Sequence, residues 1–161
     1  MKKAFLMFAA AFGFASVSSA QLGVGGGLSY LTQSEHFGIG VKANYQLENN
    51  FRPSASFTYF LSKNNTTVTL LGIDAEYLLN IDDALSVYPS VGVRHITATA
   101  SIGSYSASAS SFFLPLGGGL EYRMGSIAFQ AELRYLVALE SGDKGTFMPT
   151  IGAQYTFGTS K

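Results

Sequence analysis

Apolar and polar residues alternate along the segment IAFQAELRYLV, residues 127–137. Its odd positions are all apolar, whereas Gln130, Glu132 and Arg134 stand between them. Because successive side chains of a β-strand point to opposite faces of a sheet, this pattern predicts a strand with one apolar and one polar face. The segment alone leaves open which face points inward.

The same alternation recurs along the chain in segments of roughly ten residues that are separated by turn residues. The predicted strands cover residues 22–31, 38–47, 51–61, 68–80, 85–98, 110–124, 127–139 and 147–157. Tight connectors at 48–50, 81–84 and 125–126 alternate with longer ones at 32–37, 62–67, 99–109 and 140–146. Short turns at one end, longer loops at the other and an even strand count are typical of a transmembrane barrel. We therefore predict an all-β fold, an eight-stranded antiparallel up-and-down transmembrane β-barrel.

Two short turns allow the strand register to be predicted. A two-residue turn at Gly125-Ser126 pairs positions whose numbers sum to 251, which places Glu132 opposite Gly119 and Arg134 opposite Gly117. A long charged side chain opposite a glycine is one way to fill a narrow interior. A three-residue loop at 48–50 likewise pairs Tyr45 with Pro53 and Leu47 with Phe51 on the apolar faces.

Aromatic residues on the apolar faces gather at both ends of the strands. Those near the loop ends are Tyr30, Tyr59, Phe112, Tyr135 and Phe147. Those near the turn ends are Tyr45, Phe51, Tyr77, Tyr122, Phe129, Tyr155 and Phe157. Two aromatic belts around an aliphatic band match the two interfaces of a bilayer. The apolar faces are therefore expected to meet lipid.

The opposite faces carry small residues and a nearly balanced set of charges. The predicted lumen charge network consists of Lys42, Arg52, Asp74, Glu76, Arg94, Glu121, Arg123, Glu132 and Arg134. Buried charges cost several kcal/mol unless they are paired, and five bases against four acids suit an internal network of ion pairs. Tyr88, Phe60, Leu70 and Phe113 interrupt this polar face.

The composition fits a barrel better than a soluble domain. Charged residues make up 12% of the chain, and there is no cysteine to form a disulfide. After the first twenty residues the sequence has no apolar run long enough for a membrane-spanning helix. Without Lys2 and Lys3, eight basic and ten acidic residues leave a net charge of −2, which argues against nucleic-acid binding.

The first twenty residues are typical of a secretory signal peptide. Lys2 and Lys3 precede the short apolar run AFLMFAAAFGF, and small residues follow at 18–20. We predict cleavage after Ala20, so that residues 1–20 are the signal peptide and residues 21–161 the barrel domain. An N-terminal membrane anchor is the alternative for this segment.

Two segments resemble a known family. They are LSVYPSVGVR at 85–94, within the fifth predicted strand, and IGAQYTF at 151–157. The whole mature chain resembles the small eight-stranded outer-membrane barrels, the OmpA/OmpX-like group of porin-family β-barrel domains. The resemblance implies a location in the outer membrane of a Gram-negative bacterium. It also implies that Tyr155 and Phe157 form a terminal-strand signal for the barrel-assembly machinery, although four residues follow Phe157.

Catalytic and metal-binding patterns are weak in this sequence. His36 falls in the first predicted loop, and His95 faces outward near the outer end of the fifth strand. His95 could meet Ser110, Ser111, Glu140 and Asp143 at the rim, but no spacing fixes a catalytic triad. There is no pair of histidines at ligand spacing, so we expect neither a metal nor another cofactor. The glycine-rich run at 23–27 lies in a strand rather than before a helix.

The most distinctive connector is TATASIGSYSASASS, residues 97–111. Its weak alternation allows two interpretations, a flexible serine-rich loop or a hairpin that continues the flanking strands and turns near Gly103-Ser104. In the second case Tyr105 is the leading candidate for a contact residue. A surface partner would then bind through residues 99–109.

These observations favour a non-enzymatic integral outer-membrane protein. Its lumen is filled with charged side chains, and its surface loops serve envelope structure, adhesion or surface contact. The alternatives are a narrow porin-like channel for ions or small solutes, an outer-membrane lipid-modifying enzyme and, for the fold, a soluble lipocalin-like barrel. The expected partners are outer-membrane lipids and, during biogenesis, the barrel-assembly machinery and periplasmic chaperones, with the protein itself a monomer.

Overall fold

The computed structural model describes residues 21–103, 105–140 and 144–157. The predicted signal peptide therefore lies outside the described residues. The strands are β1 (Gln21–Leu31), β2 (His36–Gln46), β3 (Phe51–Lys63), β4 (Thr66–Tyr77), β5 (Leu79–Asn80), β6 (Leu85–Ile102), β7 (Tyr105–Met124), β8 (Ile127–Ala138) and β9 (Thr146–Phe157). The described residues form no helix, so none of them belongs to a helix that could cross a membrane.

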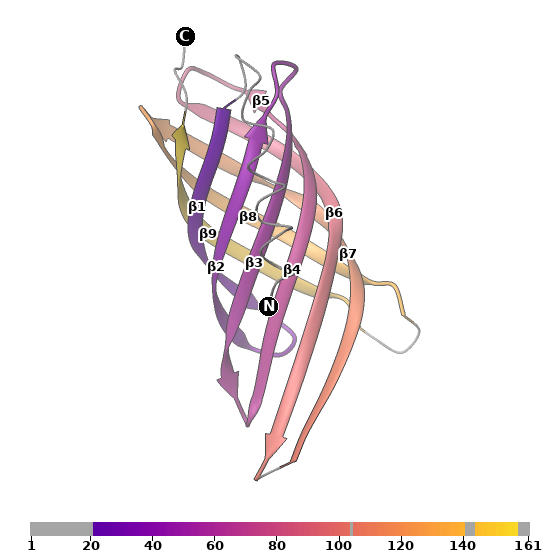
Figure 1. Cartoon of the computed structure of the whole chain (residues 1–161). Coiled ribbons are helices and arrows are strands. Elements are labelled where there is room, and N and C mark those ends of the chain that lie inside the picture. Colours follow the sequence, from indigo (N-terminus) through magenta and orange to yellow (C-terminus); the bar gives the residue numbers. More distant parts are fainter. Residues whose placement is uncertain (1–20, 104, 141–143, 158–161) are drawn as a thin grey trace, which may run out of the picture.

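The strands form one closed antiparallel barrel (Figure 1). β1 to β4 pair in chain order, as do β5 to β9. β1 also pairs with β9, and a β4–β6 pairing completes the ring. β4 and the two-residue β5 are parts of one barrel strand, interrupted at Leu78, whose N–H donates to the Asn50 carbonyl. The structure thus confirms the prediction of an eight-stranded antiparallel barrel.

The predicted registers are confirmed. β7 and β8 pair with Glu132 opposite Gly119 and Arg134 opposite Gly117. β2 and β3 pair with Asn44 opposite Ser54, which continues to a hydrogen bond between the Leu47 N–H and the Phe51 carbonyl. The tight turns therefore determine which side chains share a face, as the sequence pattern indicated.

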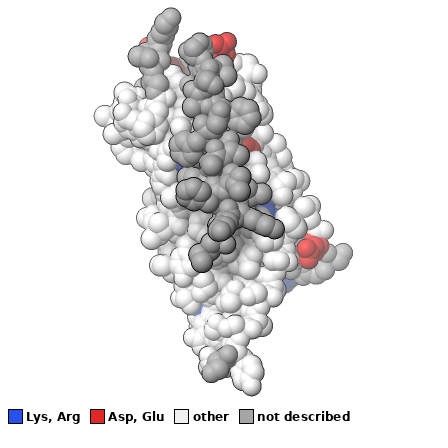
Figure 2. All heavy atoms as spheres, viewed as in Figure 1, with Lys and Arg blue, Asp and Glu red and all other residues white. Residues whose placement is uncertain are grey.

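The apolar faces point outward. Phe129 and Leu133 on β8 are 51% and 55% exposed, whereas Glu132 between them is 7% exposed. The visible described surface in Figure 2 is almost entirely uncharged, with Asp, Glu, Lys and Arg confined to small areas. Most charges of the predicted network are buried in the lumen, which is the reverse of a soluble lipocalin-like barrel.

Two of the predicted long loops are tight turns instead. β3 and β4 continue to a turn at Asn64-Asn65, and both asparagines have positive φ, at 51° and 59°. β6 and β7 run on to Ile102 and Tyr105, well past the predicted limits of 98 and 110. His36, assigned to a loop by the sequence, begins β2. The strands extend because antiparallel hydrogen bonding continues beyond the barrel wall, where apolar alternation is no longer required.

The two ends of the barrel differ in their connectors. The turn end carries the connectors before β3, β6 and β8 as well as Gln21 and Phe157, and the loop end carries the connectors before β2, β4, β7 and β9. The β6–β7 hairpin projects farthest at the loop end, at the bottom of Figure 1. The lumen and this hairpin are therefore the two candidate functional regions of the fold.

Candidate functional site

The lumen near the turn end holds a layer of charged side chains, called here the charged layer. It contains Lys42 from β2, Arg52 from β3, Asp74 and Glu76 from β4, Arg94 from β6, Glu121 and Arg123 from β7, and Glu132 and Arg134 from β8. Strand alternation aims all nine inward, and the closed ring brings them together from six strands. Most are almost fully buried, with Arg52 at 0% and Glu76 at 1% exposure.

Glu76 accepts contacts from three cations. Its carboxylate lies 2.7 Å from Arg52 Nε, 2.6 Å from Lys42 Nζ and 3.3 Å from Arg134 Nη2. The Ser54 hydroxyl donates a further hydrogen bond at 3.2 Å. Glu76 therefore links β2, β3 and β8 across the lumen.

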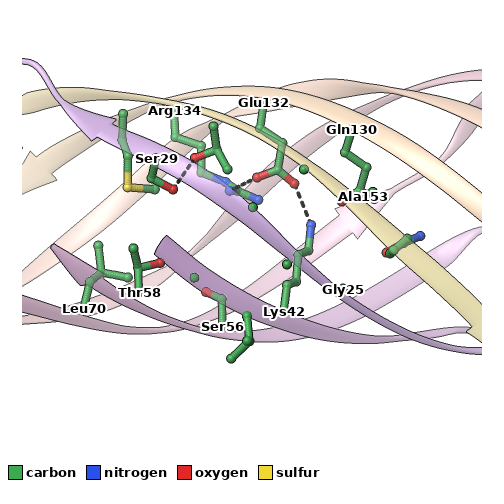
Figure 3. A pocket seen from close by; sticks show the side chains of 18 of the residues that line it. Gly25, Ser29, Lys42, Ser56, Thr58, Leu70, Gln130, Glu132, Arg134 and Ala153 are labelled. Carbon is green, nitrogen blue, oxygen red and sulfur yellow. Dashed lines mark hydrogen bonds and ion pairs between the residues drawn. The ribbon is translucent and has the colours of Figure 1, made fainter. Parts of the chain in front are cut away.

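Glu132 is a second meeting point. Lys42 Nζ and the Tyr88 hydroxyl donate to its Oε1 at 2.6 Å and 2.7 Å, and Arg134 Nη1 contacts Oε2. Figure 3 shows Lys42 reaching across the lumen toward Glu132 and Arg134. Because charge-assisted hydrogen bonds are the stronger kind, these contacts hold facing walls of the barrel together.

The remaining charges form two smaller groups. Arg94 binds Asp74 with two parallel hydrogen bonds, of 2.7 Å and 2.5 Å. Nearer the turn end, Glu121 accepts from Arg52 Nη1 at 2.5 Å and from Arg123 Nη2 at 2.8 Å. The Arg123 side chain is 26% exposed, so it lies at the margin of the layer.

The buried part of the layer is electrically balanced. Without Arg123, four cations face four carboxylates, and each carboxylate contacts at least one of the four. Such pairing offsets a desolvation penalty of several kcal/mol per ion. Arg52 Nη2 and Arg94 Nε are without a hydrogen-bond partner among the described residues. The Arg52 guanidinium instead lies 4.8 Å from the centre of the Tyr88 ring, in cation–π geometry.

The lumen near the loop end is filled differently, by what we call the apolar layer. Its buried members are Leu31, Phe60, Val68, Leu70, Phe113, Leu136 and Met148. Phe60, Leu70 and Leu136 are at most 1% exposed. The two layers lie one above the other along the barrel axis, and together they fill most of the lumen with side chains.

A small cavity of about 50 Å³ remains between the layers. Gly25 and Gly27 of β1, Lys42 of β2, and Glu132 and Arg134 of β8 are among the residues that line it. Since a water molecule needs on the order of 10–15 Å³ of such space, the cavity has room for a few waters but for no larger solute. Glycine also makes room at Gly119, where a Cβ atom would come within 2.7 Å of the Tyr88 hydroxyl oxygen.

Some lumen residues were missed by sequence reasoning. Tyr88, noted only as an interruption, contacts Glu132, Lys42 and Arg52. Gln154 bridges Asn44 and Glu121. Strand parity could have placed Gln154, Leu136 and Met148 inside, but their grouping depends on the curvature that brings distant strands face to face.

The hypothetical catalytic group is not assembled among the described residues. His95 packs on Phe112, with ring centroids 4.8 Å apart, and Ser111 belongs to the opposite face from Ser110. Glu140 is exposed, and Asp143 lies outside the described residues. His36 is buried and contacts the Ser34 carbonyl at 2.8 Å. In the described part of the chain no cluster of three His, Cys, Asp or Glu residues could hold a metal ion.

Tyr105 lies at the tip of the β6–β7 hairpin and is 85% exposed. The described residues of the segment 97–111 thus form an extended hairpin, paired up to Ile102 opposite Tyr105, and not an irregular loop. At the other end of the barrel, Tyr155 and Phe157 face outward at the close of β9, with their rings 4.9 Å apart. Both residues pair with β1, at Val24 and Leu22.

Comparison with known proteins shows the same architecture. A family model described as outer membrane protein beta-barrel domain matches residues 4–158. The N-terminal β-barrel domain of Pseudomonas aeruginosa OprF has a TM-score of 0.72 and 19% identity over 85% of this chain and 97% of its own. Ail, the attachment invasion locus protein of Yersinia pestis, has a TM-score of 0.62 and 20% identity over 86% of this chain and 97% of its own. Neisserial surface protein A has a TM-score of 0.64 and 15% identity over 87% and 96%, respectively. No curated protein sequence matches significantly.

Proposed function

The chain belongs to the outer membrane protein β-barrel domain family, and from this premise we propose that it is a non-enzymatic surface-contact protein of the outer membrane. In this proposal the filled barrel is the anchor and the β6–β7 hairpin is the element that meets a partner outside the cell. The observation that carries the proposal is the contrast between a lumen filled by two layers and an exposed hairpin that extends beyond the barrel wall.

The hairpin has the properties of a contact element. Its tip carries Tyr105, an aromatic side chain that offers contact area at a low cost in conformational entropy. Residues 106–110 are all exposed, and cross-strand hydroxyl pairs such as Thr99 with Ser108, 2.9 Å apart, keep the sheet ordered. A relative of the same fold, Ail, is described as an attachment and invasion protein, and this supports a contact role without identifying the partner.

The test is a shortened hairpin. Removal of residues 98–101 and 106–109 deletes four residues from each arm, which keeps the alternation and the turn. The purified barrel in lipid nanodiscs would be applied to protein and glycan arrays and compared with this variant and with Tyr105→Ala. Signals that are lost on shortening, in a variant that still shows the heat-dependent gel shift of a folded barrel, support the proposal. Equal signals from the unaltered barrel and from the shortened variant contradict the proposal.

The second candidate function is a narrow channel. It is favoured by the cavity between the layers, which is lined by Lys42, Glu132 and Arg134 and has room for water. Conductance across a planar bilayer, measured with protein already shown to be folded, separates the two functions. The absence of conductance supports a closed barrel that acts as an anchor. Discrete channels would show that the layers open, and Arg94, Arg134 and Glu132 would be the first residues to test for ion selectivity.

Biogenesis supplies the other proposed partners. Tyr155 and Phe157, which end the last strand on the lipid-facing side, act in this proposal as the signal read by the barrel-assembly machinery after periplasmic chaperones have delivered the chain. Cleavage after Ala20 would leave Gln21, the first residue of β1, at the N-terminus. Mass spectrometry of the protein from outer membranes tests this cleavage site.

A further inference from the structure

The alternation of polar and apolar side chains reverses along β6 at His95. Before this residue, Val91 and Val93 face outward, 46% and 48% exposed, and small polar or charged residues face the lumen. Beyond it, Ile96 and Ala98 pack against the apolar layer inside, and threonines take the outward positions. Because the outward side chains of a barrel wall match the medium around them, the reversal marks the height at which the hydrocarbon ends.

The strands on both sides of β6 change in the same way at the same height (Figure 1). Leu71 of β4 and Phe112 of β7 pair with His95 and are 58% and 49% exposed. Toward the loop end, the outward positions that follow on these three strands carry only hydroxyl side chains. They are Thr67, Thr69, Thr97, Thr99, Ser101, Ser106, Ser108 and Ser110. These residues form one surface, called here the hydroxyl face, which begins where the apolar surface ends.

The hydroxyl face is a regular array. Its rows across the sheet are Thr69, Thr97 and Ser110, followed by Thr67, Thr99 and Ser108. Since neighbouring strands lie about 4.8 Å apart and alternate residues of a strand about 7 Å apart, the hydroxyls repeat at these two spacings. The hydroxyls of Thr99 and Ser108 are 2.9 Å apart and bonded to each other. A hydroxyl donates one hydrogen bond and accepts two, so even bonded pairs can bind a further polar group.

The hydroxyl face carries no charge. Residues 64–73 and 96–112 contain no Asp, Glu, Lys or Arg. A protein surface turned to free water normally carries many charged residues, and a surface that holds anionic lipid headgroups carries Lys or Arg. Lys63, at the end of the neighbouring β3, donates to Glu35 at 2.6 Å. The hydroxyl face therefore suits a partner that is rich in hydroxyl groups and uncharged.

Aromatic rings border the hydroxyl face on the side of the barrel wall. Tyr59 of β3 pairs with Thr69 and is 43% exposed, and the ring centroids of His95 and Phe112 lie 4.8 Å apart. Aromatic rings in such a belt occupy the boundary between hydrocarbon and headgroups. The hydroxyl face is continuous with the lipid-facing wall across this belt, so the layer that lies against it is the headgroup layer of the same leaflet.

We propose that the hydroxyl face binds the uncharged sugar headgroups of glycolipids in the outer leaflet of its own membrane. A sugar headgroup offers several hydroxyls at once, and each of them can exchange hydrogen bonds with the array. The inference goes beyond the proposed contact function, because its ligand is a lipid beside the barrel and not a partner beyond the hairpin tip. Like that function, it requires that the loop end points away from the cell.

The test uses the full chain in phosphatidylcholine nanodiscs that contain increasing fractions of digalactosyldiacylglycerol, an uncharged glycolipid. NMR signals of the threonine methyl groups report on the individual positions. We expect the four threonine signals of the hydroxyl face to shift, and the shifts to saturate as the glycolipid fraction rises. The signal of Thr58, which is buried in the lumen, should stay unchanged.

A double variant, Thr97→Val with Thr99→Val, removes two central hydroxyls and keeps the β-branched shape of both side chains. It should raise the glycolipid fraction at half-saturation about fivefold, read at Thr67 and Thr69, because hydrogen bonds to the sugar are lost. The control is Ser111→Ala, which removes a hydroxyl from the inward face of the neighbouring strand and should change this fraction less than about twofold. The heat-dependent gel shift confirms that both variants are folded.

The absence of a shift at every glycolipid fraction, or an unchanged half-saturation in the valine variant, overturns the inference. Equal shifts with phosphatidic acid, which has a charged phosphate and no sugar, would show that the face responds to a charged headgroup and also overturn it. The valine variant keeps Tyr105 and the length of the hairpin. Array signals that need the hairpin, in a protein that shows no response to glycolipid, would leave the contact function standing and remove only the glycolipid site.

Discussion

The charged layer and the apolar layer fill the same lumen by different physical means. In the charged layer Glu76 and Glu132 each contact several cations, so its members are coupled. In the apolar layer Phe60, Leu70 and their neighbours share only dispersion contacts and burial from water. Because of this difference, the loss of one side chain should lower the stability of the barrel by unequal amounts in the two layers. A missing methyl group leaves a cavity, whereas a missing carboxylate also leaves cations without a partner.

The largest expected effect comes from Glu76→Gln. This change keeps the side-chain size but removes the charge that faces Arg52, Lys42 and Arg134. Breaking a buried ion pair by removing one partner costs about 3–5 kcal/mol, and we expect the free energy of unfolding to fall by about 4 kcal/mol. Urea unfolding in lipid vesicles, followed by circular dichroism, measures it. Ser54→Ala, which removes only a neutral donor to Glu76, is the control and should cost about 1 kcal/mol.

The second prediction concerns Leu70→Ala in the apolar layer. Deletion of this buried side chain should cost about 3 kcal/mol through lost burial and the cavity left behind. The matched control is the next residue, Leu71, which faces lipid and is 58% exposed. Leu71→Ala should change the same unfolding curve by less than about 1 kcal/mol, because lipid fills the space. Equal losses at both positions would contradict the assignment of the two faces.

Tyr88→Phe tests the boundary of the charged layer. The substitution keeps the ring beside the Arg52 guanidinium but removes the hydroxyl that donates to Glu132. A hydrogen bond to a charged group contributes about 1.5–3 kcal/mol, so we expect a loss near the low end, about 2 kcal/mol, in the same assay. A neutral result would show that Lys42 and Arg134 alone satisfy Glu132.

The smallest effect belongs to an exposed pair outside the barrel wall. Lys63 donates to Glu35 at 2.6 Å, and this hydrogen bond, with the nearby positive charge, lowers the pKa of Glu35. A lowered pKa stabilises the fold above the ordinary pKa of a glutamate, and this contribution disappears as the pH falls through the folded value. Lys63→Ala should return the Glu35 pKa to its ordinary range in an NMR titration. Global unfolding should stay unchanged, because exposed pairs contribute little.

The sequence predicted the strands, their register and the inward direction of the charges. It could do so because period-two alternation and tight turns are local signals. Alternation at 127–137 assigned Glu132 and Arg134 to one face, and the turn at 125–126 assigned their partners opposite. The pairing partners across the lumen could not be predicted in this way. Arg52 meets Glu121 from a position 69 residues away, and that contact depends on the curvature of the closed wall.

The full length of the β6–β7 hairpin also could not be predicted from the local sequence pattern. Residues 99–109 are serine- and alanine-rich, a composition compatible with either a loop or a strand. What decides between them is the ladder already formed below, which continues through Thr97 opposite Ser110 to Ile102 opposite Tyr105. The left-handed conformation of Gly103, with φ of 61°, then permits the reversal.

The pairing of β1 with β9 has a consequence for how the protein is made. Every other seam of the barrel joins neighbours in the chain, but this one joins Leu22 to Phe157. β1, the first strand made, can therefore complete its pairing only when β9, the last, is present. A chain that stops before β9 has two strand edges whose backbone N–H and C=O groups are unpaired, which is costly in the bilayer. Closure of this seam therefore requires the complete set of strands, and only the full-length chain can pair every backbone group of the barrel wall.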